Sequence, residues 1–425
     1  MRVLIVGNGG REHALAWKMA QSPRVSKVYV APGNGGTATE KKVENISIQA
    51  TDINCLISFA KENDVGLTVV GPEVPLVMGI VDSFTRNGLR CFGPTKAAAQ
   101  LEGSKRFAKE FMTRHGIPTA QYQIFTDPKK AKLYLKESNY PVVIKADGLA
   151  AGKGVVIAEN EVHALSVIDL FMAEQSLGAA GQQIVIEQFI TGQEVSFIVM
   201  VDGEHVLELP TSQDHKARDD GDLGPNTGGM GAYSPAPIVT AAMHNRIMRK
   251  IIEPTLRGLA EEGISYRGFL YAGLMLSEDE NPYLLEYNCR LGDPEAQVLL
   301  FRLQSDLYAL CEAAMEGKLR HTVADWMPES ALGVVLASQG YPEHYSTGEE
   351  IFGLPEEELT DGKVFHAGTK LADGKVITTG GRVLCAVAAG ASLAEAQTLA
   401  YQLADTIEWP SKYCRRDIGF KALVK

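Results

Sequence analysis

The chain has 425 residues, 45% of them hydrophobic, and a net charge of −11. This length predicts about three domains, and the acidic charge argues against nonspecific binding to nucleic acid or to an anionic membrane surface. The six cysteines are scattered without a Cys-x-x-Cys pair, which favours reduced thiols over a disulfide framework or a zinc site. The apolar run at residues 3–6 is too short for a signal peptide, and no apolar run is long enough to span a bilayer. We therefore expect a cytoplasmic protein.

The first hundred residues alternate between strand and helix patterns. Residues 3–6, 27–30 and 67–70 indicate buried strands, and residues 12–20 indicate a helix. This βαβ order predicts a parallel sheet that binds ligands at the carboxyl ends of its strands.

The turn after the first strand, residues 7–11, is similar to a dinucleotide-binding fingerprint but has Glu12 in place of the third glycine. The second strand ends at residues 30–33 without the acidic residue that would bind a ribose hydroxyl, so a nicotinamide cofactor is disfavoured. The backbone amides after Gly7 could hold a phosphate, or the segment could be a tight turn and nothing more.

A second glycine-rich loop, residues 148–154, joins two predicted strands at residues 141–147 and 155–157. A Walker-type loop must instead lead into a helix, so this loop is of another kind. Its small residues would let backbone amides lie over phosphate oxygens, with Lys145 and Lys153 as point charges. The alternative is a flexible hairpin with solvated lysines.

Two later segments are also candidates for ligand contact. Residues 184–190 indicate a strand containing Glu187, an acid that could accept a hydrogen bond from an adenine amine, although such an acid more commonly marks a strand end. Residues 224–231 contain four glycines among eight residues, and close approach of the backbone to a ligand is one reason for that composition.

Residues 283–300 carry the most information about chemistry. If this run begins as a strand, Leu284, Glu286 and Asn288 lie on one face, which ends in the oxygen ligands that Mg²⁺ prefers. Arg290 follows, and a fixed cation beside a metal site suits phosphoryl transfer. The alternative is an edge strand that runs into a solvated turn.

After residue 310 the pattern changes to a smaller, strand-rich segment. It contains predicted strands at residues 332–338 and 380–388 and a predicted helix at residues 393–407. We expect a C-terminal domain that packs on the core and helps to wall the site, without a catalytic constellation of its own.

Together these segments resemble the ATP-grasp ligases and, more narrowly, the phosphoribosylamine–glycine ligase family. The run at residues 290–297, Arg-Leu-Gly-Asp-Pro-Glu-Ala-Gln, is similar to that family's signature, and residues 6–13, 145–154, 212–216 and 225–233 agree with it. Two residues depart from the family pattern: Gln188 where an acid is usual, and Ala217 where a basic residue is common.

The resemblance implies an α/β protein that is α+β in its ATP-grasp part. The implied domains are a parallel α/β domain at residues 1–102, an ATP-grasp domain at 103–326 with a mobile lid at about 123–190, and a strand-rich domain at 327–425. The implied reaction joins glycine to 5-phosphoribosylamine through a glycyl phosphate, giving glycinamide ribonucleotide, ADP and phosphate. It uses ATP with Mg²⁺ or Mn²⁺, in a monomer or weak homo-oligomer without nucleic acid or membrane partners.

The resemblance also implies roles for individual residues. The metal ligands would be Glu286 and Asn288, and the number of metal ions stays open because the preceding strand, residues 270–276, has no acid. The implied ATP contacts are Lys105, Lys145, Gly152, Lys153, Gly154, Glu187, Phe189 and Glu194. The implied contacts to glycine and phosphoribosylamine are Gly9, Gly10, Glu73, Asp214, Lys216, Gly228, Gly229, Gly231, Arg290 and Asp293. The implied catalytic residues are Arg290, Lys145 and Asp293, and either Asp214 or Asp293 would bind the ammonium group of glycine.

Other functions remain as alternatives. They are a biotin-dependent carboxylase subunit, a purine enzyme that uses formate or bicarbonate, and a nucleotide sensor without turnover. The run at residues 290–297 disfavours the first, and the combination of Glu286, Asn288 and Arg290 disfavours the last.

Overall fold

The computed structural model describes residues 1–150, 154–174 and 176–423. Its N-terminal part is the predicted parallel sheet, in the order β3-β2-β1-β4-β5. The strands are β1 (Arg2–Gly7), β2 (Lys27–Pro32), β3 (Val43–Asn45), β4 (Val65–Val70) and β5 (Cys91–Phe92). Strand β1 is buried from its second residue onward because helices cover both faces of the sheet, as its unbroken apolar run predicts.

The turn from β1 into the first helix is set by two local features. Gly7 has a φ of +126°, which is strained for any residue with a side chain. The helix begins at Gly10, two residues earlier than predicted, because the Gly9 amide donates to the Glu12 carboxylate over 2.6 Å. The helices of this part are α1 (Gly10–Ala20), α2 (Ile53–Glu62), α3 (Glu73–Met78), α4 (Ile80–Arg86) and α5 (Gln100–Gly103).

The ATP-grasp part contains an antiparallel sheet in the order β11-β10-β16-β17. Its strands are β10 (Gln193–Val201), β11 (Val206–Glu208), β16 (Gly268–Leu276) and β17 (Pro282–Asn288). Helices α6 (Lys105–Arg114), α9 (Ala241–Ile247) and α10 (Glu253–Glu261) accompany this sheet, and residues of all three share a hydrophobic core with it.

The prediction that Leu284 shares a face with Glu286 and Asn288 is wrong. The pairing of β17 with β16 shifts by one residue between Leu284 and Glu286. This bulge puts Leu284 in the hydrophobic core, whereas Glu286 and Asn288 face a cavity.

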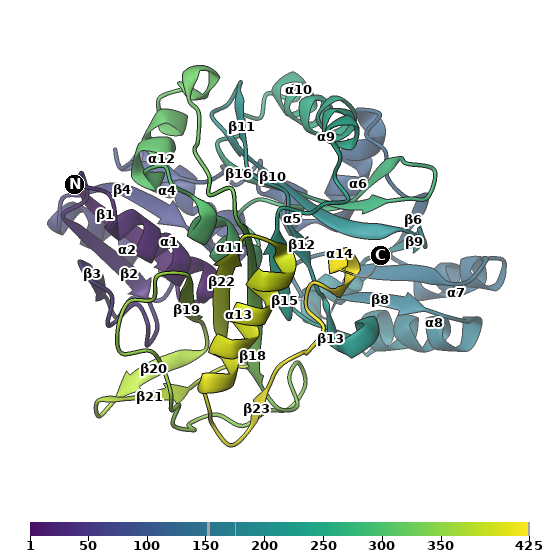
Figure 1. The fold of residues 1–425 in the computed structure, drawn as a ribbon. Coiled ribbons are helices and arrows are strands. Elements are labelled where there is room, and N and C mark those ends of the chain that lie inside the picture. The colour runs from purple at the N-terminus through teal and green to yellow at the C-terminus, as the bar shows by residue number, and fades with distance from the viewer. Residues whose placement is uncertain (151–153, 175, 424–425) are drawn as a thin grey trace.

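A separate antiparallel sheet, β6-β9-β7-β8, occupies the segment predicted to be a lid, on the right of Figure 1, and is called the lid below. Its strands and helices are β6 (Tyr122–Phe125), α7 (Pro128–Lys136), β7 (Val142–Ala146), β8 (Val155–Ala158), α8 (Glu161–Ile168) and β9 (Ile184–Gln188). The glycine-rich loop joins two paired strands, β7 and β8, as predicted. The lid has a hydrophobic core of its own, so it packs as a separate unit.

The C-terminal sheet has the order β12-β15-β18-β22-β19, with β23 beside β18, and takes two of its strands from the middle of the chain. Its strands are β12 (Gln213–Asp214), β15 (Gly231–Ser234), β18 (Ser330–Ser338), β19 (Gly362–His366), β22 (Arg382–Gly390) and β23 (Lys412–Tyr413). The remaining elements here are the hairpins β13 (Ala217–Asp219)–β14 (Leu223–Asn226) and β20 (Thr369–Ala372)–β21 (Lys375–Thr378), and helices α13 (Leu393–Thr406) and α14 (Phe420–Leu423). The glycine-rich segment at residues 224–233 therefore leads directly into a buried strand of this sheet.

Helix α11 (Glu295–Arg302) lies at the centre of the molecule, and every one of its residues is buried. The indole of Trp17 on α1 stacks on Phe301 with ring centroids 6.1 Å apart. Helix α12 (Leu307–Met315) and strands β18 and β22 share the same core. The loop between β17 and α11, residues 289–294, is thus anchored at both ends by buried elements. None of the helices in the described ranges combines the length and apolar character needed to cross a bilayer.

Leu299→Ala should lower the free energy of unfolding by about 2–5 kcal/mol, because Leu299 is fully buried in α11 and its truncation leaves a cavity. Chemical denaturation measures the change. Leu133→Ala on α7 is the control, since Leu133 is 64% exposed, and it should cost less than about 0.5 kcal/mol. Equal losses of unfolding free energy in both variants would contradict the conclusion that α11 lies at the centre of the hydrophobic core.

Candidate active site

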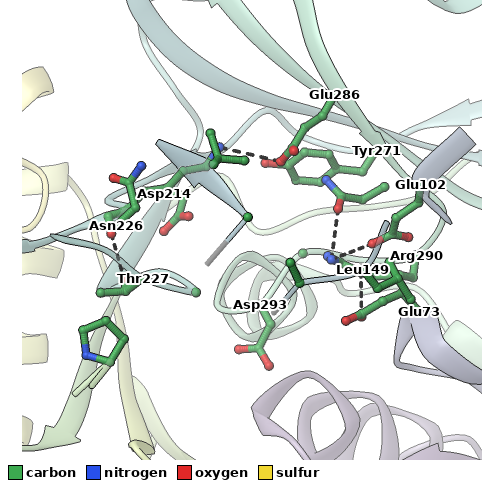
Figure 2. Close-up of a pocket in the computed structure, with 18 of the residues that line it drawn as sticks. Glu73, Glu102, Leu149, Asp214, Asn226, Thr227, Tyr271, Glu286, Arg290 and Asp293 are labelled. Atoms are coloured by element: carbon green, nitrogen blue, oxygen red, sulfur yellow. Dashed lines mark hydrogen bonds and ion pairs between the residues drawn. The ribbon is translucent and has the colours of Figure 1, made fainter. Parts of the chain in front are cut away.

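A cavity of about 570 Å³ lies where the N-terminal domain, the ATP-grasp sheet, the lid and the C-terminal sheet meet. Figure 2 shows carboxylates from several of these parts arranged around it. The charged residues of its wall are Arg11, Glu73, Glu102, Lys105, Asp214, Lys216, Glu286, Arg290, Asp293, Glu295 and Arg382. Such a wall suits a ligand that carries both phosphate and amine groups.

Arg290 is held by three neighbours from three different elements. Its guanidinium lies 2.8 Å from Glu102 and 3.5 Å from Glu73, and it donates to the Asn288 side-chain oxygen over 3.0 Å. Burial alone would lower the pKa of Arg290, but the two carboxylates raise it above its usual value. Glu102 is itself fixed, since it accepts a hydrogen bond of 2.7 Å from the Cys289 amide. The guanidinium is thus preorganised at the edge of the cavity.

Glu286 lies among ammonium groups. The Lys105 ammonium is 2.8 Å from one of its oxygens and that of Lys216 is 3.8 Å from the other, while Lys216 also pairs with Glu194 over 3.0 Å. Burial would raise the pKa of Glu286, but Lys105, Lys216 and Lys145 together hold it well below its usual value. Glu286 is therefore ionised at any physiological pH.

The donor set at this position fits one kind of metal site. Glu286 and Asn288 present a carboxylate and an amide oxygen to the cavity, and no cluster of three His, Cys, Asp or Glu side chains stands ready to hold a metal within the described ranges. Two oxygen donors suit a hard cation that takes its remaining ligands from phosphate and water.

A buried ion triad lies beside the cavity. The two oxygens of Glu187 are each 2.9 Å from a lysine ammonium, one from Lys145 and the other from Lys109. Lys145 also donates to the Leu285 carbonyl over 3.1 Å. Burial lowers the pKa of Lys109 to about 8, although Glu187 counteracts it. The triad ties β9 and β7 of the lid to α6 and β17.

Asp293 is enclosed by donors. Gln297 donates to its carboxylate over 2.8 Å and the Arg11 amide over 3.4 Å, and the Arg382 guanidinium lies 3.6 Å away. Burial would raise the pKa of Asp293, but Arg382 and Arg11 lower it. A side chain at Gly10 would overlap Gln297, so this glycine lets α1 approach the Asp293 loop closely.

Arg382, at the start of β22, is a site residue from the C-terminal domain that the sequence did not indicate. It donates to the backbone oxygens of Gly228 and Asp293, each over 2.6 Å. The Gly228 amide donates to the Tyr341 hydroxyl over 3.0 Å. Arg382 and Tyr341 line the cavity and hold two of its loops, which agrees with the expectation that this domain helps to wall the site.

Close packing also explains why residues 228, 229 and 231 are glycines. A side chain at Gly228 would overlap the Arg382 guanidinium, and one at Gly229 would overlap Asp214. At Gly231 a side chain would press on the backbone of β18. Ligand approach is thus not needed to explain this composition, and only Gly228 of the three lines the cavity.

Many of the predicted site residues meet in this cavity. Those in its wall are Glu73, Lys105, Gly154, Asp214, Lys216, Gly228, Glu286, Asn288, Arg290 and Asp293. Those outside its wall are Gly9, Gly10, Lys145, Glu187, Phe189, Glu194, Gly229 and Gly231. Gly152 and Lys153 lie outside the described residues.

Several residues of the wall carried no role in the sequence analysis: Arg11, Glu102, Tyr271, Glu295 and Arg382. Arg11 and Glu295 belong to motifs that were singled out, so their charge was a usable signal. Glu102, Tyr271 and Arg382 stand in no recognisable local pattern.

This fold, with three sheets around a cavity lined by lysine and arginine side chains, is that of an ATP-grasp ligase. Family models of phosphoribosylglycinamide synthetase match the chain along most of its length: the N domain over residues 1–102, the ATP-grasp (A) domain over 103–296 and the C domain over 331–421. The chain therefore belongs to the phosphoribosylglycinamide synthetase family.

Individual relatives agree with this assignment. A phosphoribosylamine–glycine ligase of Allochromatium vinosum is 59% identical, over 100% of this chain and 99% of the relative. One of Escherichia coli K12 is 57% identical with the same coverage. The crystal structure of a phosphoribosylamine–glycine ligase from Thermotoga maritima superposes with a TM-score of 0.84 at 36% identity, over 99% of this chain and 100% of that one. A biotin carboxylase from Campylobacter jejuni shares the fold alone, with a TM-score of 0.73 at 15% identity.

Arg382→Met should lower kcat/KM of the ligase reaction roughly 10- to 100-fold. The loops of Gly228 and Asp293 lose the guanidinium that donates a hydrogen bond to both, and they then shift relative to the cavity. Steady-state kinetics measures the loss. Arg416→Met is the matched control from the same domain, since its half-exposed guanidinium pairs with Asp405 at the surface and does not line the cavity. Wild-type rates in Arg382→Met would show that the C-terminal domain does not order the site.

Proposed function

We propose that the chain joins glycine to 5-phosphoribosylamine at the expense of ATP, giving glycinamide ribonucleotide, ADP and phosphate. The observation that carries the proposal is the cavity itself, which combines Arg290, Lys105 and Lys216 with the oxygen ligands Glu286 and Asn288. Relatives 57–59% identical over their full length bear the name of this ligase, which supports the choice of substrates.

The chemistry requires an activated acyl group, because a carboxylate is a poor electrophile. A carboxylate oxygen of glycine attacks the γ-phosphorus of ATP, the bond to ADP breaks, and glycyl phosphate forms. The amine of phosphoribosylamine then attacks the glycyl carbonyl carbon, the amine loses a proton, and phosphate leaves. The protein contributes positioning and charge neutralisation to both steps.

Arg290 would stabilise the phosphoryl group during transfer, since its guanidinium is fixed at the cavity edge by Glu102 and Asn288. Lys105 and Lys145 would bind ATP phosphates, and both are now paired with carboxylates that would share them with the nucleotide. These lysines and Arg290 offset the charge that the triphosphate brings into a low-dielectric site.

The ATP-grasp fold implies ATP together with a divalent cation, and we propose Mg²⁺ or Mn²⁺ held by Glu286 and Asn288. When bound, such a cation supplies charge neutralisation between the phosphate oxygens. Glu286 would share its negative charge between the cation and Lys105.

The remaining contacts follow the same assignment. Glu187 and the backbone of Phe189 would hold adenine, and Glu194 the ribose. Gly152, Lys153 and Gly154 would lie over the phosphates when the lid closes, which excludes water from the unstable amine and from glycyl phosphate. Glu73 and the Gly9–Gly10 turn would contact phosphoribosylamine, and Lys216 with residues 228–231 would meet the acyl phosphate or the ribose phosphate.

We place the enzyme in the cytoplasm as a monomer or weak homo-oligomer. Five of its six free cysteines are buried, which suits a reducing compartment.

Glu286→Gln should lower kcat at least about 100-fold, because it keeps the shape of the side chain but removes the charge that faces the metal and Lys105. The Mg²⁺ concentration for half-maximal rate should rise as well. Glu204→Gln is the control, since its side chain is 86% exposed and is not among the residues of the cavity wall. Full activity with unchanged Mg²⁺ dependence in Glu286→Gln would refute the metal assignment.

Phosphate release should require glycine and phosphoribosylamine together, with the unstable amine generated in the assay mixture. Formate and bicarbonate should give less than about 1% of the glycine rate, because neither carries the amine that the acidic wall of the cavity would recognise. Turnover with formate or bicarbonate but not with glycine would replace the proposed substrate.

A further inference from the structure

Lys109 is a buried lysine to which the proposed reaction gives no role. It lies on α6, its side chain is 2% exposed, and it is not among the residues of the cavity wall. Its ammonium group is 2.9 Å from one oxygen of Glu187 and donates a hydrogen bond of 2.6 Å to the Thr119 hydroxyl. The Thr119 hydroxyl in turn donates to the Leu284 carbonyl over 2.7 Å. Lys109 is therefore held both by the lid and by the segment that leads into it.

Lys145, on β7 of the lid, contacts the other oxygen of Glu187 and lies beside the cavity. Its ammonium group is 2.9 Å from that oxygen and donates to the Leu285 carbonyl over 3.1 Å. The residues that follow Lys145 and Leu285 in the chain, Ala146 and Glu286, both belong to the cavity wall. The Glu187 carboxylate thus stands between a lysine beside this wall and a lysine whose partners lie outside it.

Two ammonium groups and one carboxylate give this triad one excess positive charge. Burial lowers the pKa of Lys109 to about 8, so Lys109 is still mostly protonated at neutral pH. If Lys145 turns toward a phosphate group, Glu187 keeps Lys109 as its counter-charge. In the absence of Lys109 the same movement would take the contacting cation away from a buried carboxylate, which is costly. The charge of Lys105 also acts on Glu187, but its ammonium group contacts Glu286 over 2.8 Å.

We propose that Lys109 is a positioning residue for nucleotide binding: it neutralises Glu187, so that Lys145 can move from this carboxylate to the phosphates of ATP. The inference rests on the proposed function, which assigns Lys145 to the ATP phosphates. Glu187 then holds Lys145 in place until a triphosphate binds. Lys109 stays behind because Thr119 ties it to the backbone of β17.

The test measures how much the phosphate groups contribute to nucleotide affinity. The quantity is the dissociation constant of adenosine divided by that of adenylyl imidodiphosphate with Mg²⁺, each measured by displacement of a fluorescent ADP derivative. Lys109→Met should lower this ratio at least about tenfold, because Lys145 then stays with Glu187. Lys132→Met is the control, since this lysine of the lid pairs with Asp169 in a partly exposed position, and it should leave the ratio within about twofold.

A double variant separates this role from a long-range effect of charge. In Glu187→Gln there is no carboxylate to neutralise, so adding Lys109→Met should change the ratio less than about threefold. An equal fall in both backgrounds would overturn the proposal, because Lys109 would then act on the phosphates directly. An unchanged ratio in Lys109→Met alone would overturn it as well. Should that variant fail to fold, as its melting curve shows, Lys109→Gln decides by the same criterion, because it keeps a hydrogen-bond donor without the charge.

Failure of the proposed function has a separate signature. Lys145→Met should itself lower the ratio, and an unchanged ratio in that variant would show that Lys145 does not bind phosphate. A wild-type protein that does not bind adenylyl imidodiphosphate would refute the use of ATP altogether.

Discussion

A guanidinium clamped between two carboxylates holds the parts of this site together. Arg290 follows β17 of the ATP-grasp sheet, Glu102 belongs to α5, and Glu73 begins α3 of the N-terminal domain. Removing the arginine would leave carboxylates in the cavity wall without their counter-charge, which is costly in a low-dielectric interior. The clamp therefore fixes both a cation in the cavity wall and the contact between two domains.

The same principle of paired charge extends along the cavity. The chain as a whole carries a net charge of −11, yet its site must accept a triphosphate. Lysine side chains surround Glu286 and Glu187 in the cavity region. Each ammonium group pairs with one of these carboxylates, so its position is fixed before a nucleotide binds. Charges arranged in advance need little reorganisation during phosphoryl transfer, and this is the main contribution a protein can make to that chemistry.

Local patterns were sufficient to predict much of the fold. The parallel sheet followed from the apolar run of β1 and the glycine turn after it, and the β7–β8 hairpin followed from a glycine-rich loop with strand patterns on both sides. The common face of Glu286 and Asn288, which lines the cavity, also followed from strand alternation, although the bulge after Leu284 did not. A bulge depends on the pairing of β17 with β16, and this pairing leaves no mark in the sequence of β17 itself.

Features that depend on distant parts of the chain could not be predicted. Strands β12 and β15 join a sheet whose other members begin at Ser330, and Arg382 binds the carbonyl of Asp293 across 89 residues of sequence. Glu102 has no motif around it, and its role comes only from lying beside Arg290 after folding. Most motif residues were found because their neighbours in sequence are also their neighbours in space, although Arg11 and Glu295 were passed over. The residues that hold the motif in place were missed because their neighbours in space are distant from them in sequence.

The most direct test of the proposed glycyl phosphate intermediate is to measure whether oxygen passes from glycine to phosphate. If the carboxylate of glycine attacks the γ-phosphorus, one of its oxygen atoms must leave with the phosphate when the amide forms. Glycine labelled with ¹⁸O in its carboxylate should therefore yield inorganic phosphate that carries one ¹⁸O atom per turnover, as measured by mass spectrometry. Unlabelled phosphate formed at the same rate as glycinamide ribonucleotide would contradict the account.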